Sequence, residues 1–290
     1  MPIKNLMITG AARGIGFALA TRAIERGDKV FAMVRKQSDE TKFGQHDNLH
    51  VVVMDVAESE SVARGFAEVD QLLAGRKLDA VINAAAISIP GAIELTSTSE
   101  FEQTLNTNAL GSLRVMKAAI PRLRGHGGRV IMVTSLWGHA SGAMLSAYCM
   151  SKHAIESQVD CARRETDGMN IHIIAVEPGV VRTDMYGQQG PMVQKLLDGM
   201  SSEQGHVYEP LYQRYLNLVG GAGGQGNPDA GITVEQCAMD IEAALFDPQP
   251  KPRYQSGEDA KQIVAMVKKL SDIEMDAIML ARLNNQRIVP

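Results

Sequence analysis

Short apolar runs alternate with amphipathic stretches through the first 180 residues of the chain. The runs are rich in Val and Ile and most lack the polar alternation of a half-exposed strand, so they predict strands covered on both faces. The expected strands are residues 5–10, 29–35, 49–56, 78–86, 128–135 and 170–177. Apolar residues at three- and four-residue spacing predict helices at residues 14–26, 59–74, 99–123 and 147–167. This alternation predicts an α/β fold built on a doubly wound parallel sheet in a single domain.

The pattern changes after Pro178-Gly179. Residues 184–230 are rich in Met, Tyr, Gln and Gly and end in GGAGGQGNPDAG, a composition that predicts a flexible segment without regular structure. We interpret this long irregular insertion as a substrate lid or as disorder. Residues 236–246 predict a helix, 252–254 a short last strand, and 259–283 one final amphipathic helix. Acidic residues interrupt the apolar stretch of that helix, so we expect it to pack or form a subunit interface instead of anchoring to a membrane.

Composition narrows the class of protein. With 290 residues and a net charge of -4, the chain lacks the clustered basic excess that is typical of nucleic-acid-binding domains. Its three cysteines form no C-x-x-C pair, and its seven histidines show no metal-ligand spacing. No segment approaches the ~20 apolar residues of a membrane-spanning helix, and the N-terminus passes directly into a strand. We therefore expect a cytoplasmic protein with no metal, no nucleic-acid partner and no membrane span.

A glycine-rich turn, TGAARGIG at residues 9–16, lies where the first strand ends and the first helix begins. Small residues let the backbone approach a pyrophosphate, whose charge is then met by the unpaired N–H groups of the helix N-terminus. Tight turns need glycine in any case, so the position between strand and helix is the informative part. The spacing of Gly10, Gly14 and Gly16 differs from the G-x-G-x-x-G of the commonest dinucleotide-binding domains.

The stretch SAYCMSK, residues 146–152, places Tyr148 and Lys152 on one helical face. A tyrosine hydroxyl titrates near ~10, so it exchanges protons at neutral pH only where a positive charge stabilises the phenolate. Among the six tyrosines, only Tyr148 has a lysine at the fourth position after it. A tyrosine over a lysine stem is also common on surface helices without any function. Other segments must therefore decide whether the pair is chemical.

Together these segments resemble the classical short-chain dehydrogenases/reductases over roughly residues 3–185. The T-G-x-x-x-G-I-G turn of that family matches residues 9–16, and its Y-x-x-x-K matches Tyr148 and Lys152. Its helix asparagine matches Asn108, and its serine, thirteen residues before the tyrosine, matches Ser135. The resemblance implies a Rossmann-like dinucleotide-binding and catalytic domain over residues 1–290. The catalytic residues it implies are Asn108, Ser135, Tyr148 and Lys152.

The same resemblance implies a nicotinamide cofactor site. Asp55 followed by Val56 matches the acidic residue that faces the adenine ring, and residues 178–183 match the P-G-x-x-x-T that closes over the nicotinamide amide. The family's N-N-A-G appears as residues 83–86, NAAA, where alanines replace the second asparagine and the glycine and Ala86 narrows the space for the ribose. The expected cofactor-binding residues are Gly10, Arg13, Gly14, Ile15, Gly16, Arg35, Asp55, Val56, Asn83, Ala84, Tyr148, Lys152, Pro178, Gly179 and Thr183.

The end of the second expected strand bears on which nicotinamide cofactor binds. A carboxylate there would bind the adenosine ribose hydroxyls and repel a 2'-phosphate. The chain instead has Val34 followed by Arg35 and Lys36, with Arg13 in the glycine turn. Cations at these positions would give a 2'-phosphate charge-assisted hydrogen bonds, which predicts NADP(H) in preference to NAD(H). The alternative is that Arg35 and Lys36 are solvated residues at the start of a loop.

The mechanism implied by the resemblance is hydride transfer between nicotinamide and a carbonyl or secondary alcohol. Tyr148 would be the acid in reduction and the base in oxidation, and Lys152 would lower the tyrosine pKa and hold the nicotinamide ribose. Ser135 would donate a hydrogen bond to the developing oxyanion, and Asn108 would position a water linked to Lys152. Tyr148→Phe should then abolish turnover while cofactor binding remains.

Substrate candidates come from two segments, the residues after Ser135 and the insertion at 184–230. Flexible Met and aromatic side chains there suit a bulky apolar ligand such as a steroid, a retinoid, or an aliphatic or aromatic ketone, although ordinary packing explains them equally well. The candidates are Trp137, His139, Met144, Tyr186, Met192, Tyr208 and Tyr212. The segment PRYQSGEDA, residues 252–260, resembles the R-Y-x-x-G-x-D-A tail of the branch with 17-beta-hydroxysteroid and retinol dehydrogenases.

Three other functions fit the sequence less well. A noncatalytic dinucleotide-binding regulator on this fold would be expected to lack Tyr148 or Lys152. A nucleotide-sugar epimerase or dehydratase usually has a T-G-x-x-G-x-x-G turn and a larger C-terminal substrate domain. Enoyl reductases usually separate the tyrosine and lysine by six residues. The family resemblance also implies a homodimer or homotetramer.

Overall fold

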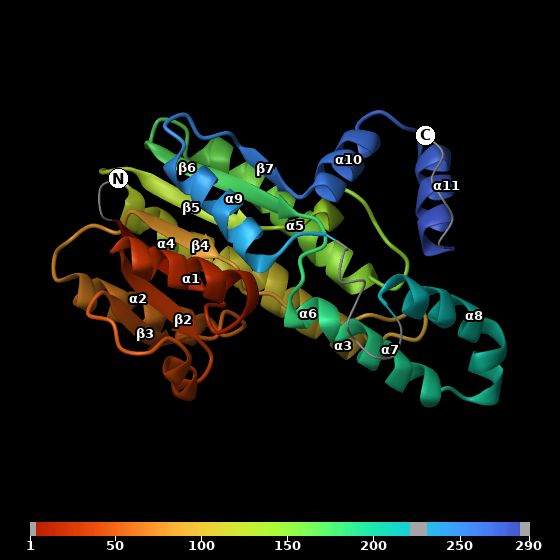
Figure 1. Ribbon diagram of the computed structural model, residues 1–290. Helices are drawn as coiled ribbons and strands as arrows, with labels where there is room; N and C mark the ends of the chain where they lie inside the picture. The colour runs from red at the N-terminus through yellow and green to blue at the C-terminus, as the bar shows by residue number, and fades with distance from the viewer. Residues whose placement is uncertain (1–3, 221–230, 285–290) are drawn as a thin grey trace.

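The computed structural model describes residues 4–220 and 231–284, which are organised around one parallel sheet of seven strands (Figure 1). The strands are β1 (Asn5–Thr9), β2 (Lys29–Val34), β3 (Leu49–Val53), β4 (Ala80–Asn83), β5 (Gly128–Val133), β6 (Ile171–Pro178) and β7 (Arg253–Ser256). Their order across the sheet is β3-β2-β1-β4-β5-β6-β7, and every neighbouring pair is parallel. The chain therefore reverses its direction of winding between β1 and β4, which confirms the predicted doubly wound sheet.

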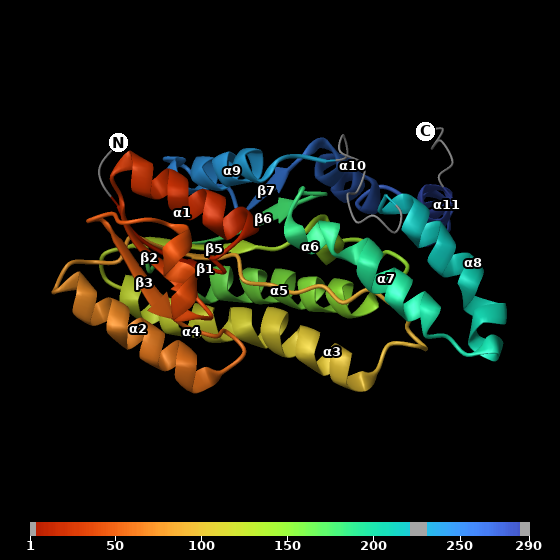
Figure 2. The ribbon, with the colours of Figure 1, turned by 60° about the horizontal axis from the view of Figure 1, so that its bottom comes forward.

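Helices cover both faces of the sheet, as Figure 2 shows from a second side. The face covered by α1 (Gly14–Arg26) and α9 (Val234–Phe246) forms one apolar core. The opposite face carries α2 (Ser59–Leu73), α4 (Gly111–Leu123) and α5 (Ser146–Glu165), which form a second core. Sheets of parallel strands are stable only when both faces are covered in this way.

The apolar runs form strands because successive side chains enter different cores. In β1, Leu6 and Ile8 belong to the core under α1, whereas Met7 belongs to the opposite one. Residues 30–34 of β2 alternate between the two cores in the same manner. A period of two with apolar residues on both sides explains why these strands have no polar alternation.

The structure corrects two predicted helices. The helix expected at 99–123 is α3 (Thr98–Leu105) and α4 joined by a π-helical turn, Asn106–Leu110. The single helix expected at 259–283 is two helices, α10 (Glu258–Val267) and α11 (Asp272–Leu283). The second of these begins with a capping box in which Ser271 and Glu274 satisfy each other's backbone N–H groups. This local start signal interrupts an apolar periodicity that by itself predicts one continuous helix.

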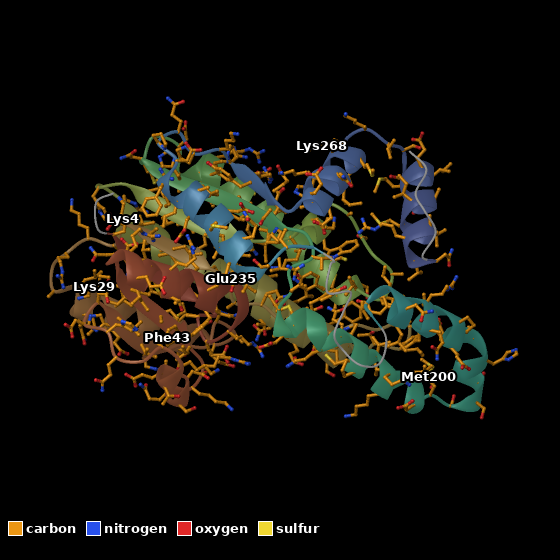
Figure 3. The ribbon with its side chains drawn as sticks, viewed as in Figure 1. Lys4, Lys29, Phe43, Met200, Glu235 and Lys268 are labelled. Carbon is orange, nitrogen blue, oxygen red and sulfur yellow. The ribbon has the colours of Figure 1, made fainter. Side chains whose placement is uncertain are left out.

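The prediction of an irregular insertion at 184–230 is also wrong for most of that segment, because its described part is helical. It forms α6 (Asp184–Gly187), α7 (Gln189–Asp198) and α8 (Ser202–Leu218), and Thr183 and Ser201 cap the first and last of them. These helices lie beyond the carboxyl ends of the strands, and Met200, between α7 and α8, is at their far end (Figure 3). Most of the glycine-rich segment that ends the insertion, at 221–230, lies outside the described residues.

Three tyrosines fasten α8 to neighbouring segments. Tyr208 donates a hydrogen bond to Glu94, and the Tyr212 hydroxyl accepts one from the Ala92 amide at 3.2 Å. Tyr215 donates to the side chain of Gln189 on α7. Spacings of four and three residues place the three side chains along one side of the helix, so α8 is held over the loop that follows β4.

No helix within residues 4–220 and 231–284 has both the length and the apolar character needed to cross a bilayer.

Candidate active site

A cavity of about 980 Å³ opens at the carboxyl ends of the strands, beside the position between β1 and β4 where the winding direction changes. This is the place where open α/β sheets bind their ligands. The cavity extends from the glycine turn to α8 and α11. Every residue that the sequence predicts for catalysis or cofactor binding lines it, except Asn83 and Asn108.

The glycine turn lies against the neighbouring strand end so closely that side chains are excluded. A Cβ atom on Gly16 would lie 2.4 Å from the Gly10 carbonyl oxygen, and one on Gly10 would lie 2.9 Å from the Cα of Ala85. Gly10 also has a φ of 65°, which favours glycine. The N-cap Arg13 makes no side-chain cap, so the first-turn N–H groups of α1 remain as donors at the cavity wall. The turn thus offers a close backbone surface to a pyrophosphate.

The far end of the cavity, next to β2 and β3, carries mixed charge. Arg35 and Lys36 are exposed and line the cavity. Lys42 and Asp39 also line it and form an ion pair of 2.7 Å, a pair that the sequence analysis missed because it lies in a short helical turn. Nearby cations, Lys42 first, hold the pKa of Asp39 below its ordinary value. Asp55 also lines the cavity and accepts a hydrogen bond from the Ala57 amide at 2.9 Å.

Tyr148 and Lys152 lie one helical turn apart on α5, with the Lys152 Nζ 5.5 Å from the centre of the Tyr148 ring. Burial raises the pKa of Tyr148 to about 12, and a hydrogen bond with Ser135 opposes that rise. Tyr148 is therefore protonated at neutral pH, as an acid for carbonyl reduction must be. Burial lowers the pKa of Lys152 to about 8, so its ammonium is mostly charged at neutral pH. That charge favours the phenolate that would remain after Tyr148 has given up its proton.

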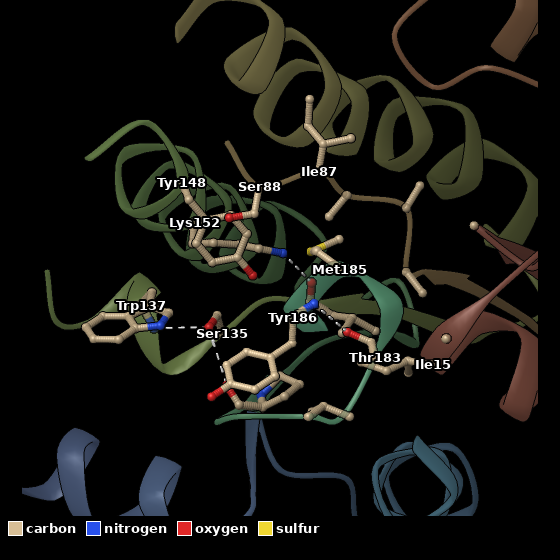
Figure 4. A pocket seen from close by; sticks show the side chains of 18 of the residues that line it. Ile15, Ile87, Ser88, Ser135, Trp137, Tyr148, Lys152, Thr183, Met185 and Tyr186 are labelled. Atoms are coloured by element: carbon tan, nitrogen blue, oxygen red, sulfur yellow. Dashed lines mark hydrogen bonds between the residues drawn. The ribbon is translucent and has the colours of Figure 1, made fainter. Parts of the chain in front are cut away.

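Ser135 follows β5 and is 4% exposed. Its hydroxyl accepts a hydrogen bond from the Trp137 amide at 3.2 Å, which fixes its orientation. Figure 4 shows Ser135, Tyr148 and Lys152 in one part of the cavity, with Tyr186 and Thr183 nearby. Three side chains that can donate hydrogen bonds therefore line one cavity, as the predicted mechanism requires. Ser135 Oγ also donates to the Pro178 carbonyl at 3.4 Å, and Lys152 Nζ donates to the Val133 carbonyl at 2.9 Å.

The segment after β6 covers the glycine turn. A Cβ on Gly14 would lie 3.4 Å from the Thr183 methyl group, so the two segments lie close together. The Thr183 hydroxyl accepts a hydrogen bond from the Tyr186 amide at 3.3 Å and starts α6. Pro178, Gly179 and Thr183 all line the cavity.

The two predicted site residues outside the cavity lining form hydrogen bonds that stabilise the segments around the cavity. Asn108, in the π-helical turn, is fully buried; its amide accepts from the Ile87 N–H and donates to the Ile87 carbonyl, both at 2.9 Å, and to Ser151 at 3.0 Å. Asn83 accepts from Thr9 at 2.6 Å and holds the ends of β1 and β4 together. Both side chains fix cavity walls instead of forming them, and the water expected at Asn108 remains a prediction.

The substrate end matches the sequence only in part. Trp137 and Tyr186 line the cavity, whereas the other five candidates lie outside its lining. The sequence analysis missed the apolar residues that α8 and α11 contribute to the cavity lining. It also missed two polar lining residues on other segments, Ser88 and Gln189. The missed wall residues are Ser88, Gln189, Tyr215, Leu218, Val219, Met279, Leu280 and Leu283. For α11, the three- and four-residue spacing of its apolar positions was a usable signal.

Comparisons with known proteins agree with this geometry. The family model described as short chain dehydrogenase matches residues 4–194. Retinol dehydrogenase 16 of Mus musculus is 31% identical over 95% of this chain and 87% of its own length. A 3-amino-tetrahydro-pyrrolizinone reductase of Xenorhabdus hominickii is 28% identical over 95% of this chain and 94% of its own. A short chain dehydrogenase of Burkholderia cenocepacia J2315, solved in complex with NADP, shares the fold with a TM-score of 0.73 at 22% identity, covering 97% of this chain and 99% of that one.

An α/β protein with this cavity and this match over more than half its length belongs to a defined class, the NAD(P)-dependent oxidoreductases. Within that class, the chain belongs to the short chain dehydrogenase family. Its similarity to a retinol dehydrogenase along almost the whole chain confirms the branch that the PRYQSGEDA segment indicated.

Proposed function

We propose that residues 1–290 act as one domain that reduces a carbonyl on an apolar substrate, with NADPH as the hydride donor, and that also catalyses the reverse oxidation. The observation that carries the proposal is the convergence of Ser135, Tyr148 and Lys152 in one cavity with the glycine turn. The cofactor supplies or accepts the hydride. Tyr148 gives its proton to the oxygen, Ser135 donates a hydrogen bond to that oxygen, and Lys152 holds the ribose and stabilises the phenolate. A water positioned at Asn108 and linked to Lys152 would return the proton from solvent.

The cofactor-binding residues proposed from the sequence fit a dinucleotide at this site. The close backbone of the glycine turn suits the pyrophosphate, and Asp55 and Val56 line the expected adenine end. The preference for NADP(H) rests on Arg35, with Lys36 and Lys42 beside it. The carboxylate of Asp39 is on the same wall, but its ion pair with Lys42 reduces its repulsion of a 2'-phosphate.

The substrate class follows from the walls at the other end. Leu218, Val219, Met279 and Leu280 give an apolar surface, which supports a steroid, a retinoid, or an aliphatic or aromatic carbonyl compound. The curated relatives named above are a retinol dehydrogenase and a reductase of a small heterocycle, so the choice among these ligands needs a direct screen.

The experiment is an NADPH oxidation screen of the purified chain across steroid, retinoid, aliphatic and aromatic carbonyls, repeated with NADH. Turnover with at least one group and a higher kcat/KM for NADPH than for NADH are expected. Absence of turnover with every carbonyl would favour the noncatalytic dinucleotide-binding regulator instead. A clear preference for NADH would overturn the cofactor assignment alone.

The assembly and compartment are further parts of the proposal. The family resemblance supports a homodimer or homotetramer, which light scattering of the purified chain would test. Cys149, Cys161 and Cys237 are unpaired thiols, which supports a reducing, cytoplasmic environment.

A further inference from the structure

Five charged or titratable residues gather next to the catalytic helix but outside the cavity lining. We call them the buried charge cluster. Its members are His139, Glu156, Asp160, Glu177 and Arg253. The Glu177 side chain is 0% exposed and that of Glu156 is 7% exposed. Carboxylates are rarely buried to this degree without a reason, because the loss of hydration is costly.

Arg253 is at the centre of the buried charge cluster. Its guanidinium is 3.0 Å from Glu156, 2.8 Å from Asp160 and 3.1 Å from Glu177. His139 adds a contact of 3.0 Å to Glu177 and is 3.8 Å from Glu156. The cluster thus joins β6, β7, α5 and the segment after Ser135, and its three carboxylates outnumber the one permanent cation.

The cluster also has the composition of a metal site, since ligand atoms of His139, Glu156 and Glu177 lie within 4.8 Å of one another. However, the Arg253 guanidinium already contacts both of these carboxylates. A bound cation would have to displace or adjoin this fixed positive charge. The arrangement is therefore complete as an ionic cluster and does not require a metal.

Glu156 connects the cluster to the active site. Tyr148, Lys152 and Glu156 are spaced four residues apart on α5, so their side chains follow one side of the helix. Gly138 lies close beside Lys152 and Glu156 and leaves no room for a side chain of its own. A Cβ there would lie 2.7 Å from the Glu156 Cγ and 3.2 Å from the Lys152 carbonyl oxygen. Lys152 itself is 2% exposed. Because Glu156 is also buried, the attraction between these two charges is only weakly screened by solvent.

The Glu156 carboxylate is only partly compensated by its neighbours. Its Oε2 receives the Arg253 contacts, whereas its Oε1 has no hydrogen-bond partner among the described residues. The charged or titratable groups that face it are Arg253 from β7, His139 from the segment after β5, Glu177 from β6 and Lys152 from α5, and Asp160, also on α5, shares Arg253 with it.

We infer that Glu156 is a positioning residue for the proposed reaction, whose carboxylate keeps the proton of the Tyr148–Lys152 pair on the lysine. The pair with one proton is either phenolate with ammonium or phenol with amine, and both forms have the same net charge. Because Glu156 is one turn from Lys152 and two turns from Tyr148, its charge favours the form with ammonium and phenolate. That form is the one present once Tyr148 has protonated the substrate. This inference rests on the proposed function.

The test is the pH dependence of NADPH-dependent carbonyl reduction in Glu156→Gln. Removing a nearby negative charge lowers the apparent pKa values of both members of the pair, since it disfavours the ammonium and favours the phenolate. The profile of kcat/KM should move toward lower pH by about one unit, with a lower kcat. Glu156→Asp should restore most of the wild-type profile.

Asp160→Asn is the matched control. Asp160 shares Arg253 with Glu156 but is one turn farther from Lys152 and more exposed. Its profile should coincide with that of the wild type. An equal displacement in both variants would overturn the assignment to Glu156, because loss of any Arg253 partner would then be sufficient. A lower free energy of unfolding in Glu156→Gln, without any displacement of its pH profile, would likewise show a purely structural role.

A second measurement does not require turnover. The ultraviolet absorbance of the phenolate is titrated in the wild type and in Glu156→Gln, each with its Tyr148→Phe counterpart subtracted. The tyrosine transition should occur at lower pH in Glu156→Gln, and coincident transitions would overturn the inference. If no carbonyl is turned over, the proposed function fails on the screen, while this titration still decides the role of Glu156.

Discussion

The Asp259 carboxylate accepts a hydrogen bond from the Val180 amide at 2.7 Å, across 79 positions of the chain. The neighbouring Gly179 lies so close that a Cβ there would be 2.0 Å from the Asp259 Oδ1. The tail segment at 252–260 therefore fastens the Pro178–Val180 backbone, which borders the cavity. The tail that resembles one branch of the family thus has a structural role, because it holds this part of the cavity border in place.

Asp259→Ala should loosen the wall formed by Pro178 and Gly179. Loss of a charge-assisted hydrogen bond costs about 1.5–3 kcal/mol, so we expect weaker NADPH binding and a lower free energy of unfolding. Fluorescence titration with NADPH and urea unfolding measure the two effects. Asp259→Asn keeps an acceptor and should recover much of both. Asp272→Ala, which removes an exposed carboxylate from α11, is the control, and equal effects in the two alanine variants would contradict this role.

Tyr148→Phe tests the proton donor. The phenyl ring preserves the shape of the side chain but has no hydroxyl, so turnover should fall by at least ~10³-fold. NADPH binding should change little, because Lys152 and the glycine turn remain. Rates are measured under saturating NADPH, with the affinity determined separately. Substantial residual activity would refute the assignment of Tyr148.

Arg35→Glu tests the cofactor preference. A carboxylate at the cavity wall repels a 2'-phosphate and can accept hydrogen bonds from ribose hydroxyls. We expect kcat/KM with NADPH to fall by about 100-fold, equivalent to ~2.7 kcal/mol, and kcat/KM with NADH to change far less. Lys268→Glu makes the same charge reversal at an exposed position outside the cavity lining (Figure 3). Similar losses in the two variants would indicate a general effect of charge.

His139 gives a pH-dependent contribution to folding. A hydrogen bond with Glu177 raises the pKa of His139 above its ordinary value of 6.5, although burial acts in the opposite direction. Because the folded-state pKa is the higher one, the stabilisation is fully present below pH ~6.5 and is lost as the pH rises through the folded-state pKa. The difference in unfolding free energy between the wild type and His139→Gln should therefore shrink as the pH rises.

Urea unfolding at a series of pH values measures that difference. His46→Gln, at an exposed position, corrects for the general effect of removing a histidine. A difference that grows with increasing pH would have the wrong sign and would contradict the assignment.

Substitution of Phe66 tests how much the core beneath α2 contributes to the stability of the fold. It is fully buried in the core shared with Val69 and Met54, and the Arg122 guanidinium lies 4.9 Å from its ring centre. Phe66→Ala should lower the free energy of unfolding by about 3–5 kcal/mol. NADPH affinity at a temperature well below the unfolding transition should be unchanged. A large change in affinity would place Phe66 in a role that its position does not suggest.

The sequence predicts the sheet, and the place of the proposed catalytic residues Ser135, Tyr148 and Lys152 in one cavity, because both depend on local patterns. Apolar runs identify β1 to β6 because both faces of each strand are buried. Tyr148 and Lys152 share a face through helical spacing alone, and the residues at 9–16 form their turn through local backbone requirements.

The parts that the sequence does not predict depend on contacts between distant segments. The composition of 184–230 resembles a loop, but α8 is stabilised by tyrosine hydrogen bonds to Glu94 and to the Ala92 backbone, which no local pattern reveals. His139 was expected beside the substrate, but the structure places it with Glu177, 38 positions away. Arg253 was recognised as part of a motif, but its three carboxylate partners become apparent only after folding.

Because α11 lines one end of the cavity, substitutions at the proposed substrate end fall on different residues from substitutions at the proposed cofactor end. The glycine turn and the proposed adenine end of the cavity come from the first 60 residues, whereas much of the apolar wall comes from α8 and α11, after residue 200. Substitutions in those two helices can reshape the space for the substrate without moving the groups that transfer the proton. If the proposed function holds, libraries confined to α8 and α11 should alter substrate scope while cofactor use is preserved.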